Sequence, residues 1–211
     1  SIVAIGAYTN DGNGKVVSGH TRIYQWDSAS SSWNKLGSDI DGEAALDGCG
    51  TSVSLSRDGS IVAIGAYNAK DGNGLNSGHV RIYQYSSGSW SQLGNDIDGE
   101  AANNYFGQSV SISGDGTTIA AGATHNDGNG TNSGHTRIYR WNGTAWNQLG
   151  GDFDGEAAHD HSGSGVSLST DGNIVAIGAR YNDGNGEKSG HTRIYEWNSG
   201  SSSWNQRGSD I

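Results

Sequence analysis

Four near-identical copies of one unit fill the chain, and this internal repeat limits the folds that the chain can adopt. Each copy contains the run I-V-A-I-G-A (I-A-A-G-A in the third), then S-G-H-[TV]-R-I-Y, and then a Trp. The His residues of successive copies are separated by 59, 56 and 56 positions. A unit of this length exceeds the roughly 20–45 residues of solenoid repeats, and it suits one blade of a β-propeller.

Each unit contains four candidate strands. S-V-S-L-S alternates apolar and small polar residues, I-V-A-I-G-A is a buried apolar run, H-T-R-I-Y-x-W is rich in β-branched and aromatic residues, and S-W-N-x-L-G is a short outer strand. Asp-Gly pairs join the first strand to the second, as in tight hairpins. The predicted fold class is therefore all-β, a β-propeller built from four-stranded antiparallel blades. The expected single domain, 1–211, divides into blade 1 (1–46, lacking its first strand), blade 2 (47–103), blade 3 (104–160) and blade 4 (161–211).

Composition excludes several classes of protein. Twelve Lys and Arg against 22 Asp and Glu give a net charge of −10, the wrong sign for a nucleic-acid surface. No apolar run approaches the roughly 18 residues of a membrane span. The single Cys excludes a disulfide framework. Thirty-six Gly and no Pro indicate that the turns are glycine turns.

The third unit resembles the FG-GAP repeat of integrin α-chain propellers. The resemblance rests on Tyr105-Phe106-Gly107-Gln108-Ser109-Val110 followed by Gly122-Ala123, and the other copies align with it at fixed spacing. In that family Phe-Gly opens the innermost strand and Gly-Ala-Pro closes the second. The Pro is replaced here, and the family's calcium loop is reduced to an Asp-Gly turn, so that cation site does not transfer. The resemblance implies a propeller used for extracellular recognition.

The repeated His and Arg of the third strand are predicted to be structural. A catalytic site needs one asymmetric set of groups, whereas these residues recur in every unit. We expect the Arg side chains to bridge neighbouring blades. The residues are His20, Arg22, His79, Arg81, His135, Arg137, His191 and Arg193.

The acidic string D-[IF]-D-G-E-A-A places oxygen donors at positions 1, 3, 5 and 9 of a loop, a pattern that suits Ca²⁺. The alternative is a set of solvated acidic loops. The candidate ligands are Asp39, Asp41, Glu43, Asp47, Asp96, Asp98, Glu100, Asp152, Asp154, Glu156 and Asp160. In a four-stranded blade these loops share one face with the N-D-G-N-G loops, so that face is expected to be acidic.

Two other patterns are specific to single units. His159-Asp160-His161, with His125, breaks the repeat and could hold a transition metal. Asn129 and Asn142 are glycosylation acceptors if the protein is secreted in a eukaryote.

These observations predict a non-enzymatic adhesion or protein-interaction module, extracellular or at the cell surface, that binds a protein or glycan through its acidic face. The alternative is a lectin with one sugar site per blade, and an enzyme is the weakest of the three interpretations. Because the S-V-S strand occurs three times and the other strands four times, we expect further repeats or another copy to complete the ring.

Overall fold

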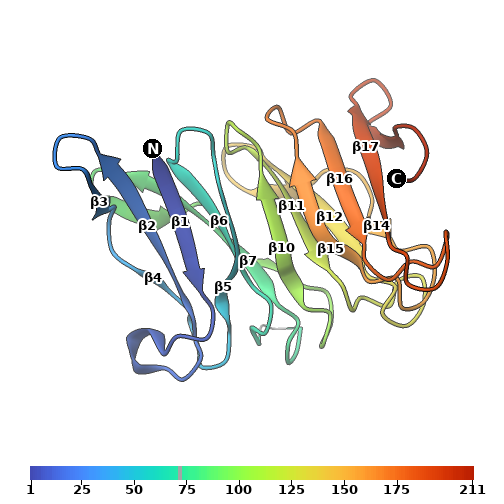
Figure 1. Cartoon of the computed structure of the whole chain (residues 1–211), viewed down its shortest axis with the longest axis horizontal. Helices are drawn as coiled ribbons and strands as arrows, with labels where there is room; N and C mark the ends of the chain where they lie inside the picture. Colours follow the sequence, from blue (N-terminus) through green and yellow to red (C-terminus); the bar gives the residue numbers. More distant parts are fainter. Residues whose placement is uncertain (71–72) are drawn as a thin grey trace.

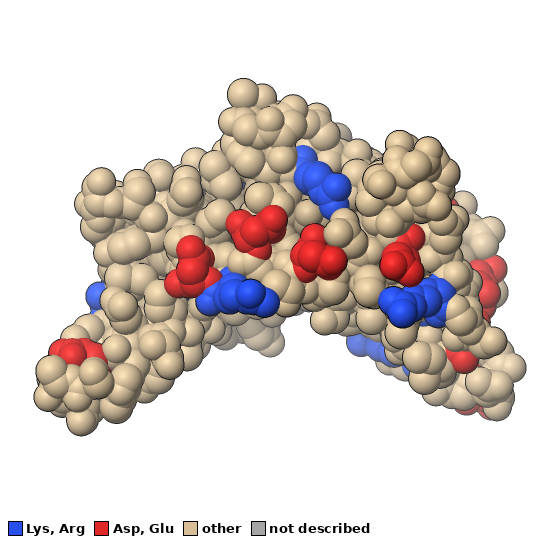
Figure 2. All heavy atoms as spheres, turned by 90° about the horizontal axis from the view of Figure 1, so that it is seen from above, with Lys and Arg blue, Asp and Glu red and all other residues tan. Residues whose placement is uncertain are grey.

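The computed structural model describes residues 1–70 and 73–211 as four antiparallel sheets that follow one another along an arch (Figures 1 and 2). The fold class predicted from the repeat is confirmed. Within these residues no helix is long and apolar enough to cross a membrane. A single turn of 3-10 helix is present at Gly12–Gly14.

The first sheet begins with the apolar run, so it lacks the innermost strand of the other three. β1 pairs with β2, and β2 pairs with both β3 and the short β4, which together form a broken outer strand. The strands are β1 (Ile2–Ala7), β2 (His20–Asp27), β3 (Ser32–Lys35) and β4 (Ile40–Asp41). Among the described residues β1 has no partner on its inner edge.

The other three sheets have the complete order of innermost, second, third and outer strand. The second sheet contains β5 (Cys49–Leu55), β6 (Ile61–Ala66), β7 (His79–Ser86), β8 (Ser89–Gln92) and β9 (Ile97–Asp98). The third contains β10 (Phe106–Ile112), β11 (Thr118–Ala123), β12 (His135–Trp141), β13 (Trp146–Gln148) and β14 (Phe153–Asp154). The fourth contains β15 (Ser162–Leu168), β16 (Ile174–Ala179), β17 (His191–Asn198) and β18 (Ser203–Gln206).

The acidic strings are not simply loops. Their first residues form β4, β9 and β14, which pair with the start of the third strand and place Asp41, Asp98 and Asp154 opposite the repeated His. The alternation Asp-Phe-Asp or Asp-Ile-Asp has the two-residue period of a strand, and the apolar residue between the acids turns toward the core. The loop interpretation was therefore wrong for Asp41, Asp98 and Asp154, whereas the other acids of the strings lie outside these strands.

The apolar core lies between the blades. One cluster combines Ala63, Val80 and Ile82 of the second blade with Phe106 and Ile119 of the third, and two similar clusters fill the joints on either side. The runs I-V-A-I-G-A lie at these joints, where each blade packs against the next. Strands that are covered on both faces need continuous apolar sequence, which explains why these runs do not alternate.

The blades approach so closely at one point that only glycine fits. A Cβ atom on Gly65 would lie 1.9 Å from the carbonyl oxygen of Gly107 in the next blade, and the same contact recurs between Gly122 and Gly163 at 2.1 Å. The backbone of one blade thus rests directly on the backbone of the next. The glycine of the first three G-A pairs is required by this packing, whereas Gly178 in the fourth has no such contact.

Figure 2 shows the face that carries the Asp-Gly turns between first and second strands, and acidic and basic side chains lie close together there. The loops that follow the second strand and those that lead to the next blade lie on the opposite side, at the lower edge of Figure 1. The repeated His stand at that edge, because each begins a third strand. The candidate site is therefore built at the joints, near the acidic loops.

Candidate functional site between the blades

Each of the three joints is tied by the same hydrogen bond. The indole Nε1 of the outer-strand Trp donates to the backbone oxygen of a Leu in the preceding blade, at 2.8 Å in every case. The pairs are Trp90 with Leu36, Trp146 with Leu93, and Trp204 with Leu149. Because the indole is amphipathic, its ring packs in the joint while its N–H is satisfied across it.

The repeated Arg side chains also lie at the joints. Arg137 donates to Glu100 of the preceding blade and to both carboxylate oxygens of Asp152 in its own blade. Arg81 and Arg193 contact the equivalent acids, Glu43 at 3.0 Å and Glu156 at 3.5 Å. These three side chains are 4–13% exposed.

Arg22 differs from the other three because no described blade precedes it. Its guanidinium contacts Asp39 of its own blade only, and its side chain is 44% exposed. Asp39 also pairs with Lys35. The hydrogen bond from Arg22, together with the contact to Lys35, lowers the pKa of Asp39 to about 2.

The four acids of one string do not meet around a common point. Position 1 (Asp39, Asp96, Asp152) faces the third strand of its own blade, and position 5 (Glu43, Glu100, Glu156) faces the next blade. Position 9 turns into its own loop. There Asp47 and Asp160 are buried and accept the backbone N–H of Ala44 and Ala157.

The structure instead gathers acids around the repeated His. Four groups have ligand atoms within 4.8 Å of one another: His20, Asp39 and Asp41; His79, Asp96 and Asp98; Glu100, His135 and Asp152; Glu156, His191 and Asp210. In the last two groups the Glu comes from the preceding blade. The sequence pattern did not combine the His with the acids, because they meet only when a short outer strand pairs with the third strand or, in the last two groups, when two blades are packed.

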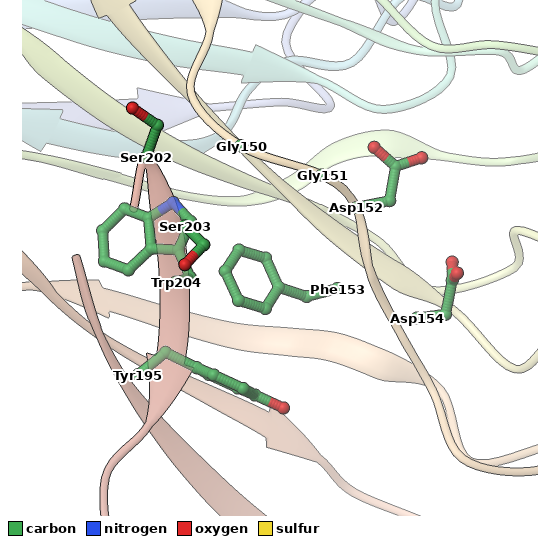
Figure 3. Close-up of a pocket in the computed structure, with 9 residues that line it drawn as sticks. All are labelled: Gly150, Gly151, Asp152, Phe153, Asp154, Tyr195, Ser202, Ser203 and Trp204. Carbon is green, nitrogen blue, oxygen red and sulfur yellow. The ribbon is translucent and has the colours of Figure 1, made fainter. Parts of the chain in front are cut away.

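A pocket of about 340 Å³ lies between the outer strands of the third and fourth blades (Figure 3). Its side chains are Asp152, Phe153, Asp154, Tyr195 and Trp204, together with Ser202 and Ser203. The two Asp side chains point to the same side of their segment, and Phe153 points to the other side, where its ring stands together with those of Tyr195 and Trp204. The ring centroid of Phe153 is 4.7 Å from that of Tyr195 and 5.8 Å from that of Trp204.

The pKa values of the two Asp in this pocket shift in opposite directions. Partial burial raises the pKa of Asp154, and the nearby Asp152 and Glu100 raise it further. Burial alone would raise the pKa of Asp152 too, but hydrogen bonds from Arg137 and Gln148 lower it below its ordinary value. Burial likewise raises the pKa of Tyr195, which therefore keeps its proton.

The corresponding pocket between the first and second blades, about 360 Å³, is lined by Asp39, Ile40, Asp41, Tyr83 and Trp90. It repeats the same elements with Ile40 in place of Phe153. Ile40 is 6% exposed and belongs to the core. Of these two pockets, only the one between blades 3 and 4 has an aromatic residue, Phe153, between its two Asp in the sequence.

The glycosylation candidates have different surroundings. Both are exposed, but the side-chain amide of Asn129 donates to the backbone oxygens of Gly155 and Glu156 across a joint. Asn142 uses its side-chain oxygen within its own turn, where it accepts the backbone N–H of Thr144. Both remain predictions.

His125 and His161 stack edge to face in a row of aromatic rings, with a centroid distance of 4.7 Å. Burial, followed by the nearby His125 and Arg180, lowers the pKa of His161 to about 4. Asp160 opposes this shift, and His159 adds to it. The ring is therefore neutral at pH 7.

This shift predicts a pH dependence of stability. The folded-state pKa lies below the ordinary value of 6.5, so the unfolded chain takes up the proton first as the pH falls. We expect stability to be lost from about pH 6.5 down to about pH 4, and His161→Asn to remove part of that loss. Asn suits the positive φ of 53° at this position. Melting temperatures of both proteins across this range test the prediction, which fails if the two curves stay parallel.

The comparisons with known proteins identify the repeat and the fold. The FG-GAP repeat model matches residues 97–139 and 154–195. Among solved structures, a proposed 6-phosphogluconolactonase from Bacteroides uniformis has a TM-score of 0.61 and 13% identity, over 100% of this chain and 55% of that one. The periplasmic gluconolactonase PpgL of Pseudomonas aeruginosa has a TM-score of 0.55 and 16% identity, over 93% and 50%. No curated protein matches the sequence.

These comparisons correct the expected function. Three of the solved structures that share the fold are described as lactonases, so the expectations of a non-enzymatic adhesion module or a lectin, and of no enzymatic activity, are wrong. The joints between blades are not identical, as Phe153 and Ile40 show. The chain spans about half the length of these structures, with which it shares the fold at 12–16% identity. Two segments of the chain thus match the FG-GAP repeat, and the chain has an all-β, propeller-type fold.

Proposed function

We propose that the chain is part of a hydrolase that opens lactones of sugar acids in the pocket between blades 3 and 4. One observation carries the proposal: Asp152 and Asp154 line the same pocket as the rings of Phe153, Tyr195 and Trp204 (Figure 3). Carboxylates supply acid–base chemistry, and aromatic rings pack on the apolar faces of a sugar ring. The descriptions of the similar solved structures support this class of substrate.

The chemistry assigns a role to each polar side chain. Asp154 accepts a proton from the water that attacks the lactone carbonyl carbon, and the Tyr195 hydroxyl donates to the oxyanion that forms. The bond between that carbon and the ring oxygen then breaks, and Asp154 returns the proton to the ring oxygen. Asp152 is held by Arg137, so it is the poorer base of the two.

The charge of the chain favours an unphosphorylated substrate. The net charge is −10, and two carboxylates line the pocket itself. A phosphate group would be repelled by this field, whereas a neutral lactone would not. We therefore propose a neutral sugar lactone as substrate.

The test is the rate of opening of glucono-1,5-lactone by the purified chain, measured above the uncatalysed rate. Asp154→Asn should lower kcat by about 100-fold or more, since it removes the general base. Asp41→Asn is the matched control, because it removes the same repeat position from the pocket between blades 1 and 2. No rate above the uncatalysed reaction, or equal losses in the two variants with both folded, would overturn the proposal.

Two further parts of the proposal concern the setting of this site. We propose a location outside the cytoplasm, supported by the periplasmic description of one similar structure. We also propose that a further strand of the S-V-S type pairs with the open inner edge of β1, supported by the pairing of β6, β11 and β16 with such strands.

A further inference from the structure

The group formed by Glu100, His135 and Asp152 contains a buried ring nitrogen with no partner. The His135 side chain is 2% exposed, and among the described residues its Nδ1 makes no hydrogen bond. Glu100 Oε2 and Asp152 Oδ2 each lie 3.9 Å from this nitrogen, which is beyond hydrogen-bond distance. The space between the three atoms is therefore bounded by one nitrogen and two carboxylate oxygens.

The first blade shows how the same His is satisfied when no blade precedes it. There His20 Nδ1 lies 3.0 Å from the side-chain oxygen of Asn10. In the third blade the equivalent Asn126 turns its amide to Glu100 Oε2, at 3.1 Å, and its oxygen to the backbone of Gly128. The arrival of Glu100 from the preceding blade thus removes the partner of the His nitrogen.

The fourth blade repeats the residues of this group, but there the buried ring nitrogen without a hydrogen bond among the described residues is His191 Nε2. His191 Nδ1 lies 3.8 Å from Glu156 Oε2 and 3.5 Å from Asp210 Oδ2, and the His191 side chain is 4% exposed. Asn182 again donates to the Glu, at 3.3 Å. Two joints therefore bring together the same three kinds of residue, although their other contacts differ.

We propose that Glu100, His135 and Asp152 bind a divalent transition-metal cation of the Zn²⁺ class. An imidazole nitrogen with two carboxylates is a common Zn²⁺ donor set, and it leaves a fourth position open. Ca²⁺ takes oxygen ligands only, so the nitrogen favours the transition metal.

The surrounding residues support the carboxylates in this role. Arg137 donates to Glu100 Oε1 and to Asp152 Oδ1, the oxygens that do not face His135. Its additional bond to Asp152 Oδ2 would be given up to the cation. Gln148 also donates to Asp152 Oδ1. Such outer contacts fix the orientation of ligating carboxylates.

The experiment titrates the chelator-treated, dialysed chain with Zn²⁺ alone by calorimetry, and follows its melting temperature. We expect His135→Asn to lose one Zn²⁺ equivalent, with at least 100-fold weaker binding at that site. His20→Asn is the matched control, since that nitrogen already has a partner, and it should lose none. Co²⁺ bound in place of Zn²⁺ should give the visible absorption of a four-coordinate site, absent at the altered joint.

The proposal is overturned if His135→Asn binds Zn²⁺ like the unaltered chain, or if His20→Asn loses as much. Should His135→Asn not fold, Glu100→Gln keeps the shape of the side chain while removing its charge, and retained binding in that variant overturns the proposal equally. The readout is metal binding, so it is independent of the proposed hydrolysis. If the chain binds Zn²⁺ but does not open lactones, only the proposed hydrolysis is refuted.

Discussion

Gly65→Ala is expected to cost more than about 4 kcal/mol of unfolding free energy, and Gly178→Ala almost nothing. A Cβ on Gly65 would lie 1.9 Å from the Gly107 oxygen, and backbone atoms of two packed blades cannot move aside as a flexible side chain can. Gly178 occupies the same repeat position in the fourth blade, but the nearest atom to its Cβ would be 3.7 Å away. Denaturant unfolding followed by circular dichroism measures both.

The comparison isolates the contact between blades from the preference of glycine within a strand. Both glycines lie in a second strand and precede an Ala, so their local conformations correspond. Gly122→Ala should behave like Gly65→Ala, since its Cβ would lie 2.1 Å from the Gly163 oxygen. If Gly178→Ala destabilised the protein as much as the other two, close approach of the blades would not be the cause.

Arg81→Ala should cost about 3 kcal/mol, because it leaves a cavity and an unsatisfied backbone acceptor at a buried joint. The side chain is 4% exposed, and it contacts Glu43 at 3.0 Å and the backbone oxygen of Asp41 at 3.1 Å. Lys should not restore the stability, since it lacks the planar fork that reaches both.

Arg22→Ala provides the control for this second prediction. Arg22 has the same neighbours in sequence, but its side chain is 44% exposed and its one acid is in its own blade. The expected cost is under about 1 kcal/mol, as for other exposed ion pairs. The unfolding free energies of the two variants test this prediction. If Arg81→Ala and Arg22→Ala lower the unfolding free energy equally, the position of Arg81 at a joint adds nothing to its contribution to stability.

The sequence was sufficient to predict the strands and the blades because both depend on local, repeated patterns. The two-residue period of S-V-S-L-S and the continuous run I-V-A-I-G-A each specify a strand within a few residues, and four copies confirm one another. The hairpin turns followed from Asp-Gly pairs in the same way.

The candidate site could not be predicted to the same extent, because two of its His and acid groups and its pocket combine residues of different blades. Asn10 and Asn126 occupy the same sequence position, yet one faces a His and the other a Glu from the preceding blade. Nothing in the local sequence distinguishes them. The pocket did leave a signal, since the alternation of Asp152, Phe153 and Asp154 places two carboxylates on one side of a strand.

The hydrogen bond from the Trp indole at each joint has a consequence for the number of units that such a chain can contain. At each of the three joints the outer-strand Trp donates to the blade before it, and a Leu carbonyl accepts from the blade after it. Tandem duplication or deletion of one unit in the gene would join surfaces that carry the same donor and acceptor, so this hydrogen bond would form again at the new joint. The number of units would then be limited by the curvature of the arch, which decides when the first blade meets the last.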